Sequence, residues 1–334
     1  MENKNKDTLR TVVYSEKNVG QNQSRVVTSD WKSLQDDPIY QSMLKNMGIG
    51  NIHPMYIEVT ENQNLEEEYA KIVRFLRTFI FYYAEKYNAD SREINIQFIN
   101  YGKTELVYVL TEKSGHRVTL LVKQPAVELG KVQQEVENLK QLRKYDEKVV
   151  APIDYFSVEG QELYMTPYIN QARCIASDRY WGMYIPEPYY RFENFTEQQA
   201  KVVTTCMIAK LVSFFDFKNN EGIKSCKLGG GDFMLPKGWE LQVPTIENTL
   251  DNLYFIAARE KIHCSFEEYL NFIRKEFSRR TINEPQENLV INLRGRVAIS
   301  PEDIESGIKL GQQLIDNRNN KVLNKKLNID NTNN

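Results

Sequence analysis

Cysteine and histidine are scarce in this sequence, which restricts the kinds of site it can build. The four cysteines lie far apart and form no Cys-x-x-Cys pair, and the three histidines show no metal-ligand spacing. Structural zinc sites use short, regular ligand spacings, and disulfide frameworks belong to oxidising compartments. We therefore expect reduced thiols in a cytoplasmic protein and no Cys/His metal centre.

Long hydrophobic runs are also absent. The most apolar helical stretch, residues 75–83, contains Arg77 and is much shorter than the roughly 20 apolar residues that cross a bilayer. Residues 1–7 are polar and no apolar core follows them, so the sequence predicts no signal peptide. We expect no transmembrane segment.

Neither sign of charge prevails, because 43 basic side chains face 45 acidic ones and the net charge is −2. Proteins that bind nucleic acid or anionic membranes without specificity carry a basic excess. The basic cluster at residues 294–296 is short and typical of ordinary surface. Nucleic acid is therefore not an expected partner.

The composition fits a folded protein with unstructured ends. Hydrophobic residues make up 41% of the 334 positions, enough for one large domain or two medium ones. Residues 1–50 are polar and without periodicity, which predicts a disordered or loosely docked arm. The Asn- and Lys-rich residues 317–334 predict a disordered tail.

Helices are predicted where apolar residues recur at three- and four-residue steps or where a capping box opens a segment. Capping boxes pair Thr196 with Gln199 and Ser265 with Glu268, and Ser300 precedes a proline that suits a first helical turn. The segments expected to be helical are 65–87, 127–145, 196–217, 265–277 and 300–315.

Strands are predicted where β-branched and apolar residues alternate between turn signals. Ser114-Gly115 and Glu159-Gly160 supply two tight turns. The segments expected to be strands are 94–99, 105–111, 117–123, 149–156 and 162–168. The plan is five antiparallel strands with one helix inserted after the third.

Three short motifs in this region resemble the small lobe and hinge of the protein-kinase-like superfamily, which includes the aminoglycoside phosphotransferases. Lys123 ends the apolar run 120–122, and Glu135 follows twelve residues later in a Glu-Val-x-x-Leu pattern. Residues 165–168, Met-Thr-Pro-Tyr, stand where the hinge would be. The resemblance covers about residues 94 to 280.

The resemblance implies an α+β, two-lobed protein-kinase-like fold. Residues 51–168 would form an N-terminal helix with a small antiparallel β lobe that contains one helix. Residues 169–316 would form a mainly helical large lobe. It also implies ATP and magnesium as possible cofactors.

In this superfamily the strand lysine holds the α- and β-phosphates and a helix glutamate holds the lysine, roles that fall on Lys123 and Glu135. Gly102 would begin the loop over the phosphates. The Thr166 carbonyl and the Tyr168 amide would face adenine. The alternative is that Lys123 and Glu135 are surface charges on neighbouring elements.

The catalytic segment fits the superfamily less well and allows two alignments. In the first, which we favour, Lys227 takes the place of the catalytic aspartate, Asp232 that of the metal-binding asparagine, and Thr245 that of the second metal-binding aspartate. A lysine cannot accept a hydroxyl proton at neutral pH and would repel a metal. Asp232 could still hold one magnesium ion. This alignment predicts a pseudokinase, with a hairpin over residues 233–243.

In the second alignment Asp216 is the catalytic base, Asn220 a metal ligand and Asp232 the second metal-binding aspartate. It keeps every acidic role, but it puts glycines 229–231 where a buried strand should precede Asp232. An active or atypical ATP-dependent phosphotransferase, acting on a small molecule or a protein, therefore stays as the second hypothesis. The third is an α+β interaction protein without a nucleotide.

An aromatic insertion spans residues 173–195 and is broken by two prolines. Aromatic side chains at this density often mark a partner surface, which predicts a possible protein partner here. The alternative is a loop that packs as a lid over the large lobe.

Overall fold

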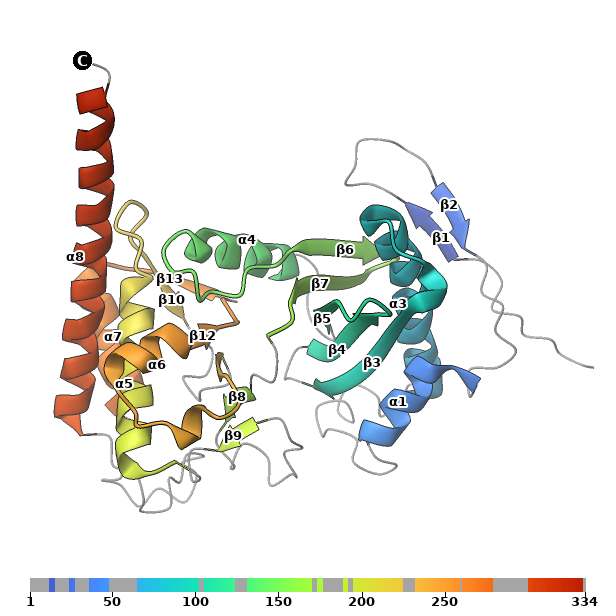
Figure 1. The fold of residues 1–334 in the computed structure, drawn as a ribbon, viewed down its shortest axis with the longest axis horizontal. Helices are drawn as coiled ribbons and strands as arrows, with labels where there is room; N and C mark the ends of the chain where they lie inside the picture. The colour runs from blue at the N-terminus through green and yellow to red at the C-terminus, as the bar shows by residue number, and fades with distance from the viewer. Residues whose placement is uncertain are drawn as a thin grey trace, which may run out of the picture. The chain divides into compact units, whose positions relative to one another are not determined.

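The computed structural model shows a mixed α+β protein with two compact units (Figure 1). Unit 1 comprises Met1–Gln133 and Pro152–Tyr168, and unit 2 comprises Gln134–Ala151 and Ile169–Asn334. The structure describes residues 12–15, 24–27, 36–47, 65–101, 105–123, 131–169, 173–176, 189–191, 195–224, 232–258, 260–278 and 300–332.

Unit 1 is built on a five-stranded antiparallel sheet with the strand order β3-β4-β5-β7-β6. The strands are β3 (Ile94–Tyr101), β4 (Glu105–Glu112), β5 (Arg117–Lys123), β6 (Asp154–Val158) and β7 (Gln161–Pro167). This confirms the predicted sheet. Two short strands, β1 (Val12–Ser15) and β2 (Ser24–Val27), pair separately.

The sheet's tight turns use the residues that the sequence indicated. Gly115 and Gly160 have φ of +89° and +80°, values that glycine adopts without strain. The strand expected to start at 149 begins only at Asp154. The reason is that the Val150 amide donates to the Phe255 carbonyl of unit 2 (2.8 Å). This amide is therefore not available to pair with β7.

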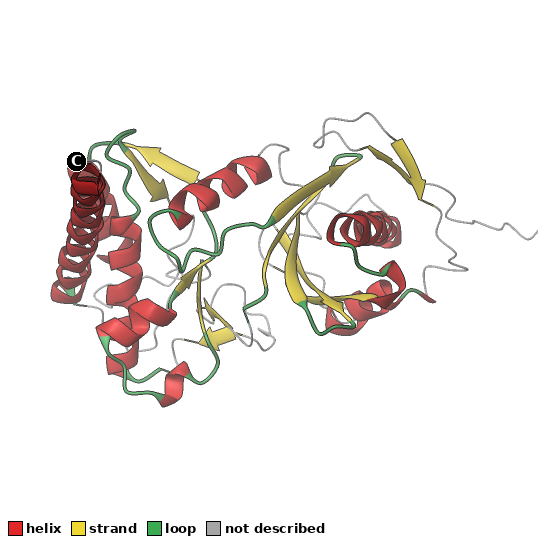
Figure 2. Ribbon diagram, turned by 45° about the horizontal axis from the view of Figure 1, so that its top comes forward, coloured by secondary structure: helices red, strands yellow, loops and turns green. Residues whose placement is uncertain are grey.

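Helix α3 (Leu65–Tyr87) covers one face of the sheet, with the bounds that its apolar periodicity predicted (Figures 1 and 2). Fully buried Phe79 packs edge-on against Phe156 of β6, with ring centres 5.5 Å apart. The even-numbered residues of β4 and β5 point into the same core. The other face of the sheet belongs to the odd-numbered residues of these strands.

Part of the arm expected over residues 1–50 is ordered against unit 1. Helix α1 (Pro38–Met47) begins after Asp37, whose Oδ1 accepts the Ile39 amide (2.5 Å). The Oδ2 atom of Asp37 accepts from Arg77 of α3 at 3.0 Å. The Ser42 hydroxyl accepts the Phe98 amide (3.0 Å) beside the irregularity in β3. The helix thus protects an edge strand, which would otherwise offer unpaired backbone groups.

Unit 2 is mainly helical. Its helices are α4 (Lys131–Arg143, assigned to unit 2 from Gln134 onward), α5 (Glu197–Ser213), α6 (Ile246–Asn252), α7 (Phe266–Ser278) and α8 (Pro301–Thr332). Residues 134–151, which belong to the domain predicted over 51–168, cluster with unit 2. Both predicted capping boxes are present.

Helix α8 lies along α5 at very short range. A Cβ atom at Gly307 or Gly311 would stand 2.8 Å from Ile208 or 2.6 Å from Val212. The helix continues to Thr332, beyond the end predicted near Ile315 and through the segment expected as a disordered tail. No glycine or proline follows Gly311 to stop it. Helix α5, in contrast, ends four residues before the predicted Phe217.

Unit 2 also holds two small sheets. One has the order β12-β11-β8-β9 and the other pairs β10 with β13. The strands are β8 (Arg173–Ala176), β9 (Tyr189–Arg191), β10 (Glu221–Lys224), β11 (Phe233–Leu235), β12 (Tyr254–Phe255) and β13 (Glu260–His263).

The hairpin predicted over 233–243 is wrong. Gly238 has φ of +90°, and Trp239–Leu241 form a single 3-10 turn. Trp239 is buried in the core of unit 2 against Phe195, with ring centres 5.5 Å apart. Burial of the indole redirects the chain, and β11 pairs instead with β12 beyond α6. Among the helices that the structure describes, none is long and apolar enough to cross a membrane.

Candidate functional site

The predicted nucleotide site centres on Lys123, the last residue of β5. Its side chain is only 6% exposed. Strand residues alternate between faces, so Lys123 shares its face with Leu121 and Thr119, opposite to the face that α3 covers. On neighbouring β4, Val107 lies opposite Leu121 and is partly exposed. Lys123 thus ends a mainly apolar strip that lies outside the α3 core.

A buried carboxylate that sequence reasoning missed lies on the same face. Val122 pairs with Leu163 of β7, so the next position along the two strands puts Glu162 across from Lys123. Glu162 is 7% exposed and accepts a hydrogen bond from the Tyr155 hydroxyl. Burial, with that hydrogen bond, raises the pKa of Tyr155 to about 12. Only the register of the folded sheet reveals this neighbour, because Glu162 is remote from Lys123 in the sequence.

The residues of the predicted hinge lie at the end of β7. The Ile153 amide donates to the Met165 carbonyl (2.7 Å), which therefore points toward β6. Carbonyl directions alternate along a strand, so the Thr166 carbonyl points toward β5, where Thr166 pairs with Thr119. The Thr166 carbonyl is thus a ladder acceptor and not the outward acceptor that the hinge hypothesis needs.

Tyr168, the second hinge residue, lies just beyond the last paired residue of β7, Pro167. The guanidinium carbon of Arg117 stands 5.7 Å from the centre of the Tyr168 ring, within the range of a cation–π contact. The Tyr168 amide follows the end of the ladder and stays the candidate backbone donor. Gly102, the predicted loop residue, lies outside the described residues.

Glu135, the predicted partner of Lys123, lies on α4 and is 1% exposed. It belongs to unit 2, whereas Lys123 belongs to unit 1. Their ion pair therefore stays a prediction. Two residues of the same helix, Asn138 and Gln141, form hydrogen bonds within unit 2: the Asn138 amide to the Ala258 carbonyl (2.8 Å) and the Gln141 amide to Asp216 Oδ2 (2.9 Å).

Asp216, the catalytic base of the second alignment, closes the turn after α5. Its Oδ1 atom accepts the amides of Lys218 (2.9 Å) and Asn219 (3.2 Å), and its Oδ2 atom accepts the side-chain amides of Asn219 (2.8 Å) and Gln141. Burial raises the pKa of Asp216, but these hydrogen bonds outweigh burial and hold the pKa below its ordinary value. A general base needs an accessible lone pair and a pKa near the working pH. Asp216 is better suited to hold this turn than to take a proton.

The metal-binding positions of the first alignment lie around β11 and β12. Asp232 is half-buried directly before β11, and its backbone carbonyl accepts the Ile256 amide (2.9 Å). Thr245 is the N-cap of α6, where its hydroxyl accepts the Asn248 amide (3.1 Å). Strand β11 pairs with β12, which lies beyond α6, so Thr245 stands in the connection between the two strands and not in a strand. Lys227 lies outside the described residues.

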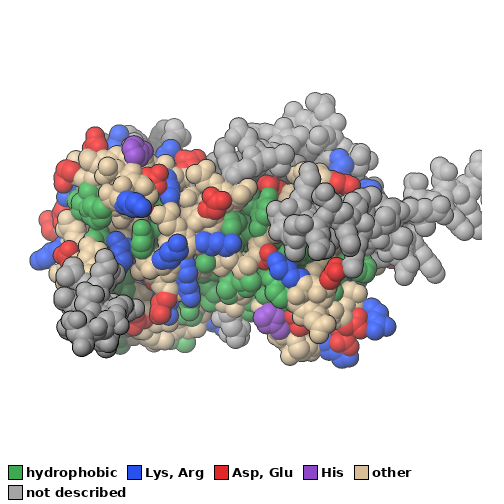
Figure 3. Space-filling view, turned by 90° about the horizontal axis from the view of Figure 1, so that it is seen from above, with side chains coloured by type: hydrophobic (Ala, Val, Ile, Leu, Met, Phe, Trp, Pro, Cys, Tyr) green, Lys and Arg blue, Asp and Glu red, His purple; other side chains and the backbone are tan. Residues whose placement is uncertain are grey.

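Metal-binding capacity is limited in the described ranges, where no group of three or more His, Cys, Asp or Glu side chains could hold an ion. A magnesium ion at Asp232 stays a prediction. The face drawn in Figure 3 carries side chains of both charges, and several basic ones lie close together near the middle of the view.

The aromatic insertion contributes strands to unit 2. Strand β8 pairs with β11, and β9 runs parallel to β8 with Cys174 opposite Tyr189. The two ends of the insertion are therefore built into a sheet. Residues 177–188, which hold several of its aromatic side chains, lie outside the described residues, so a partner surface there stays a prediction.

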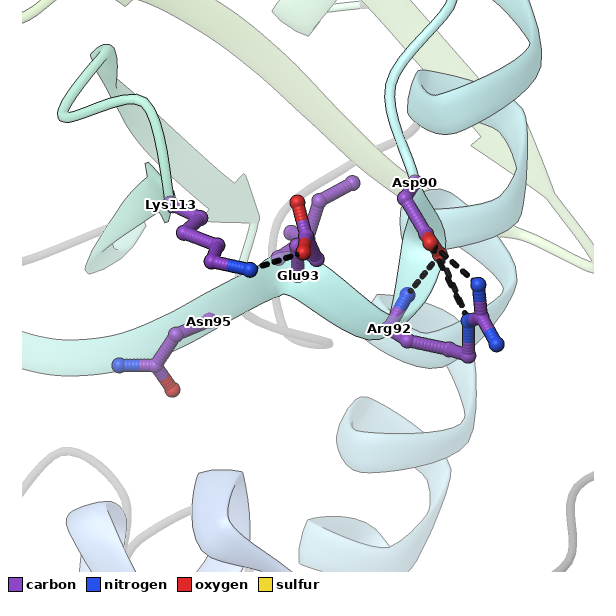
Figure 4. Close-up of a pocket in the computed structure, with 6 residues that line it drawn as sticks. Asp90, Arg92, Glu93, Asn95 and Lys113 are labelled. Carbon is purple, nitrogen blue, oxygen red and sulfur yellow. Dashed lines mark hydrogen bonds and ion pairs between the residues drawn. The ribbon is translucent and has the colours of Figure 1, made fainter.

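A hollow on unit 1 contains none of the predicted site residues (Figure 4). It is lined by Asp90, Arg92, Glu93, Ile94, Asn95 and Lys113. Its charges neutralise one another, with Arg92 2.6 Å from Asp90 and Lys113 2.5 Å from Glu93. Exposed pairs of this kind contribute little energy, and the hollow offers no unbalanced charge to a ligand.

The features on which a site hypothesis can rest are thus the Lys123 strip of unit 1 and the Asp216 and Asp232 region of unit 2. Compared with known protein families and with curated proteins, the chain gives no match in either case.

Proposed function

We propose that the chain is a non-catalytic, kinase-like protein that binds a nucleotide on the Lys123 face of the unit 1 sheet. The observation that carries the proposal is the position of Lys123. It ends the central strand of a sheet with the order β3-β4-β5-β7-β6, on the face opposite to α3. The five-stranded antiparallel sheet, with a helix after its third strand in the chain, supports the proposal.

The chemistry of this face supports a ligand with an apolar end and an anionic end. Val107, Thr119 and Leu121 are partly exposed and could contact a flat base, while the ammonium of Lys123 could contact a phosphate. Binding sites commonly combine an apolar lining with a few well-placed polar groups. Tyr168 supplies a backbone amide at the other end of the strip.

Three features support a non-catalytic protein over a phosphotransferase. Lys227 stands where the favoured alignment needs a base. The Asp216 carboxylate already accepts four hydrogen bonds, three from its own turn and one from Gln141 of α4. In the favoured alignment Thr245 takes the place of the second metal-binding aspartate, and its hydroxyl caps α6.

Calorimetric titration with ATP, with and without magnesium, tests the proposal. Lys123→Ala should abolish binding. The matched control is Lys113→Ala, which removes an exposed lysine in the turn after β4 that pairs with Glu93 and should leave binding intact. Asp232→Ala should weaken binding only when magnesium is present. Equal affinity of wild type and Lys123→Ala for ATP would show that the nucleotide does not bind on the Lys123 face.

A phosphotransfer assay separates the alternatives. Wild-type protein should bind ATP without consuming it. ATP turnover that Asp216→Asn eliminates, at a temperature where circular dichroism shows the variant to be folded, would establish the active phosphotransferase instead. Absence of nucleotide binding by the wild type would favour the third hypothesis, an interaction protein without a nucleotide. The aromatic insertion would then be the surface to study.

A further inference from the structure

We infer that residues 134–143 of α4 are locked to unit 2 by Asn138 and Gln141, and open together with unit 2 as one cooperative unit. In the chain, this helix is inserted between strands β5 and β6 of unit 1. Its contacts nevertheless assign residues from Gln134 onward to unit 2. The inference concerns the mechanics of the fold and does not depend on nucleotide binding.

Asn138 provides a buried hydrogen bond. Its side chain is 4% exposed, and its amide donates to the Ala258 carbonyl over 2.8 Å. Ala258 is fully buried just after β12. Removing one partner of a buried hydrogen bond leaves the other unsatisfied, which costs more than the bond itself contributes. The bond therefore fixes the middle of α4 to the segment that follows β12.

Gln141 provides two further hydrogen bonds one turn later. Its amide group donates to Asp216 and its carbonyl accepts from the Lys261 ammonium at 3.0 Å. That ammonium also contacts Glu221 at 2.9 Å. One side chain of α4 is thus bonded to the turn after α5 and to β13, while β13 is joined to β10.

The end of α4 is held as well. Leu139 and Leu142 are buried in the hydrophobic core of unit 2. Just beyond the helix, Asp146 forms an ion pair with Lys210 of α5, whose side chain is 4% exposed. The Phe255 amide donates to the Lys148 carbonyl (3.0 Å). Apolar packing and polar contacts therefore both attach the end of α4 to unit 2.

The functional consequence is that Glu135 cannot be repositioned by a rotation of α4 alone. Any ligand that shifts Glu135 has to move unit 2 with it or break the bonds of Asn138 and Gln141. The segment after β12, which carries no metal-binding carboxylate, acts here as the anchor of a helix. The helix position is thus set by contacts within unit 2.

Hydrogen exchange of the full chain, read by mass spectrometry, tests the inference because local opening follows cooperative units. Tyr269→Phe removes hydroxyl contacts to the Leu211 and Ile223 carbonyls of unit 2. It should raise exchange about tenfold in residues 134–143 as well as in α5. Phe79→Leu loosens the core of unit 1 and should raise exchange in β3 to β5 but not in α4. Two outcomes would overturn the inference. One is faster exchange in α4 in the Phe79→Leu variant. The other is unchanged exchange in α4 in the Tyr269→Phe variant when exchange in α5 has risen.

A second pair of variants tests the lock itself. Asn138→Ala should raise exchange about tenfold over residues 135–143 without loosening α5. Its control, Lys140→Ala, changes an exposed position on the same helix and should have no such effect. Unchanged exchange in Asn138→Ala would show that the buried bond does not hold the helix. Should Asn138→Ala unfold, the comparison of Tyr269→Phe with Phe79→Leu still decides.

Discussion

The ring of Tyr269 lies so close to Gly222 that a Cβ atom at position 222 would stand 2.3 Å from the ring carbon Cε2. The tyrosine cannot withdraw easily, because its hydroxyl donates to the Leu211 carbonyl (3.2 Å) and the Ile223 carbonyl (3.0 Å). Gly222→Ala should therefore destabilise unit 2 by about 1 to 3 kcal/mol through overpacking. Chemical denaturation monitored by fluorescence measures the change. An unchanged midpoint would mean that the ring has room to shift.

The contact between α5 and α8 gives a second stability prediction. Gly311→Ala adds a methyl group 2.6 Å from the Cβ of Val212 and 2.8 Å from the Ala209 carbonyl oxygen. The helices would have to separate, at a cost of about 1 to 3 kcal/mol. Ser306→Ala, at an exposed position of the same helix, should be neutral or slightly stabilising because alanine favours helix. Similar melting temperatures for the two variants would contradict the close packing.

The turn held by Asp216 predicts a loss of stability in acid. The folded-state pKa of this carboxyl lies below its ordinary value of 3.8, so its contribution is present above that value and disappears as the pH falls through the folded pKa. Asp216→Asn should lower the free energy of unfolding at pH 7. The difference from wild type should shrink steadily below about pH 4. A difference that stays constant down to pH 2 would show that the charge plays no part.

Tyr155 predicts the opposite dependence in alkali. Its folded-state pKa is raised to about 12 from an ordinary value of 10.0. The unfolded chain therefore loses this proton first, and stability falls between these two pH values. Tyr155→Phe should make the decline shallower in that interval. Equilibrium unfolding at several alkaline pH values provides the slope, and identical slopes would refute the raised pKa of Tyr155.

The predictable part of the fold is the part that neighbouring residues determine. The alternation of apolar and polar side chains, with turns at Gly115 and Gly160, was sufficient to predict the strands of the unit 1 sheet. The step of three and four residues was sufficient for α3. The side chains that open α5 and α7 lie within three positions of the amides they cap. Each of these signals acts within one turn or one hairpin of its own position.

The parts that could not be predicted depend on distant contacts. Trp239 turns its segment away from a hairpin because Phe195 and the core of unit 2 bury the indole. Asn138 meets Ala258, which is 120 positions away. Glu162 comes beside Lys123 only through the pairing of β5 with β7. For the candidate site, sequence reasoning selected the lysine but could not find its neighbour on the sheet.

The place of β7 between β5 and β6 has a consequence for synthesis on the ribosome. Until residues 161–167 have emerged, β5 is an open edge and the nascent sheet is incomplete. Helix α4 is made earlier still, yet its partner Ala258 emerges much later. A translation pause once Tyr168 has left the ribosome would therefore give the sheet of unit 1 time to form. Helix α4, in contrast, gains its hydrogen bond to Ala258 only after most of unit 2 has emerged.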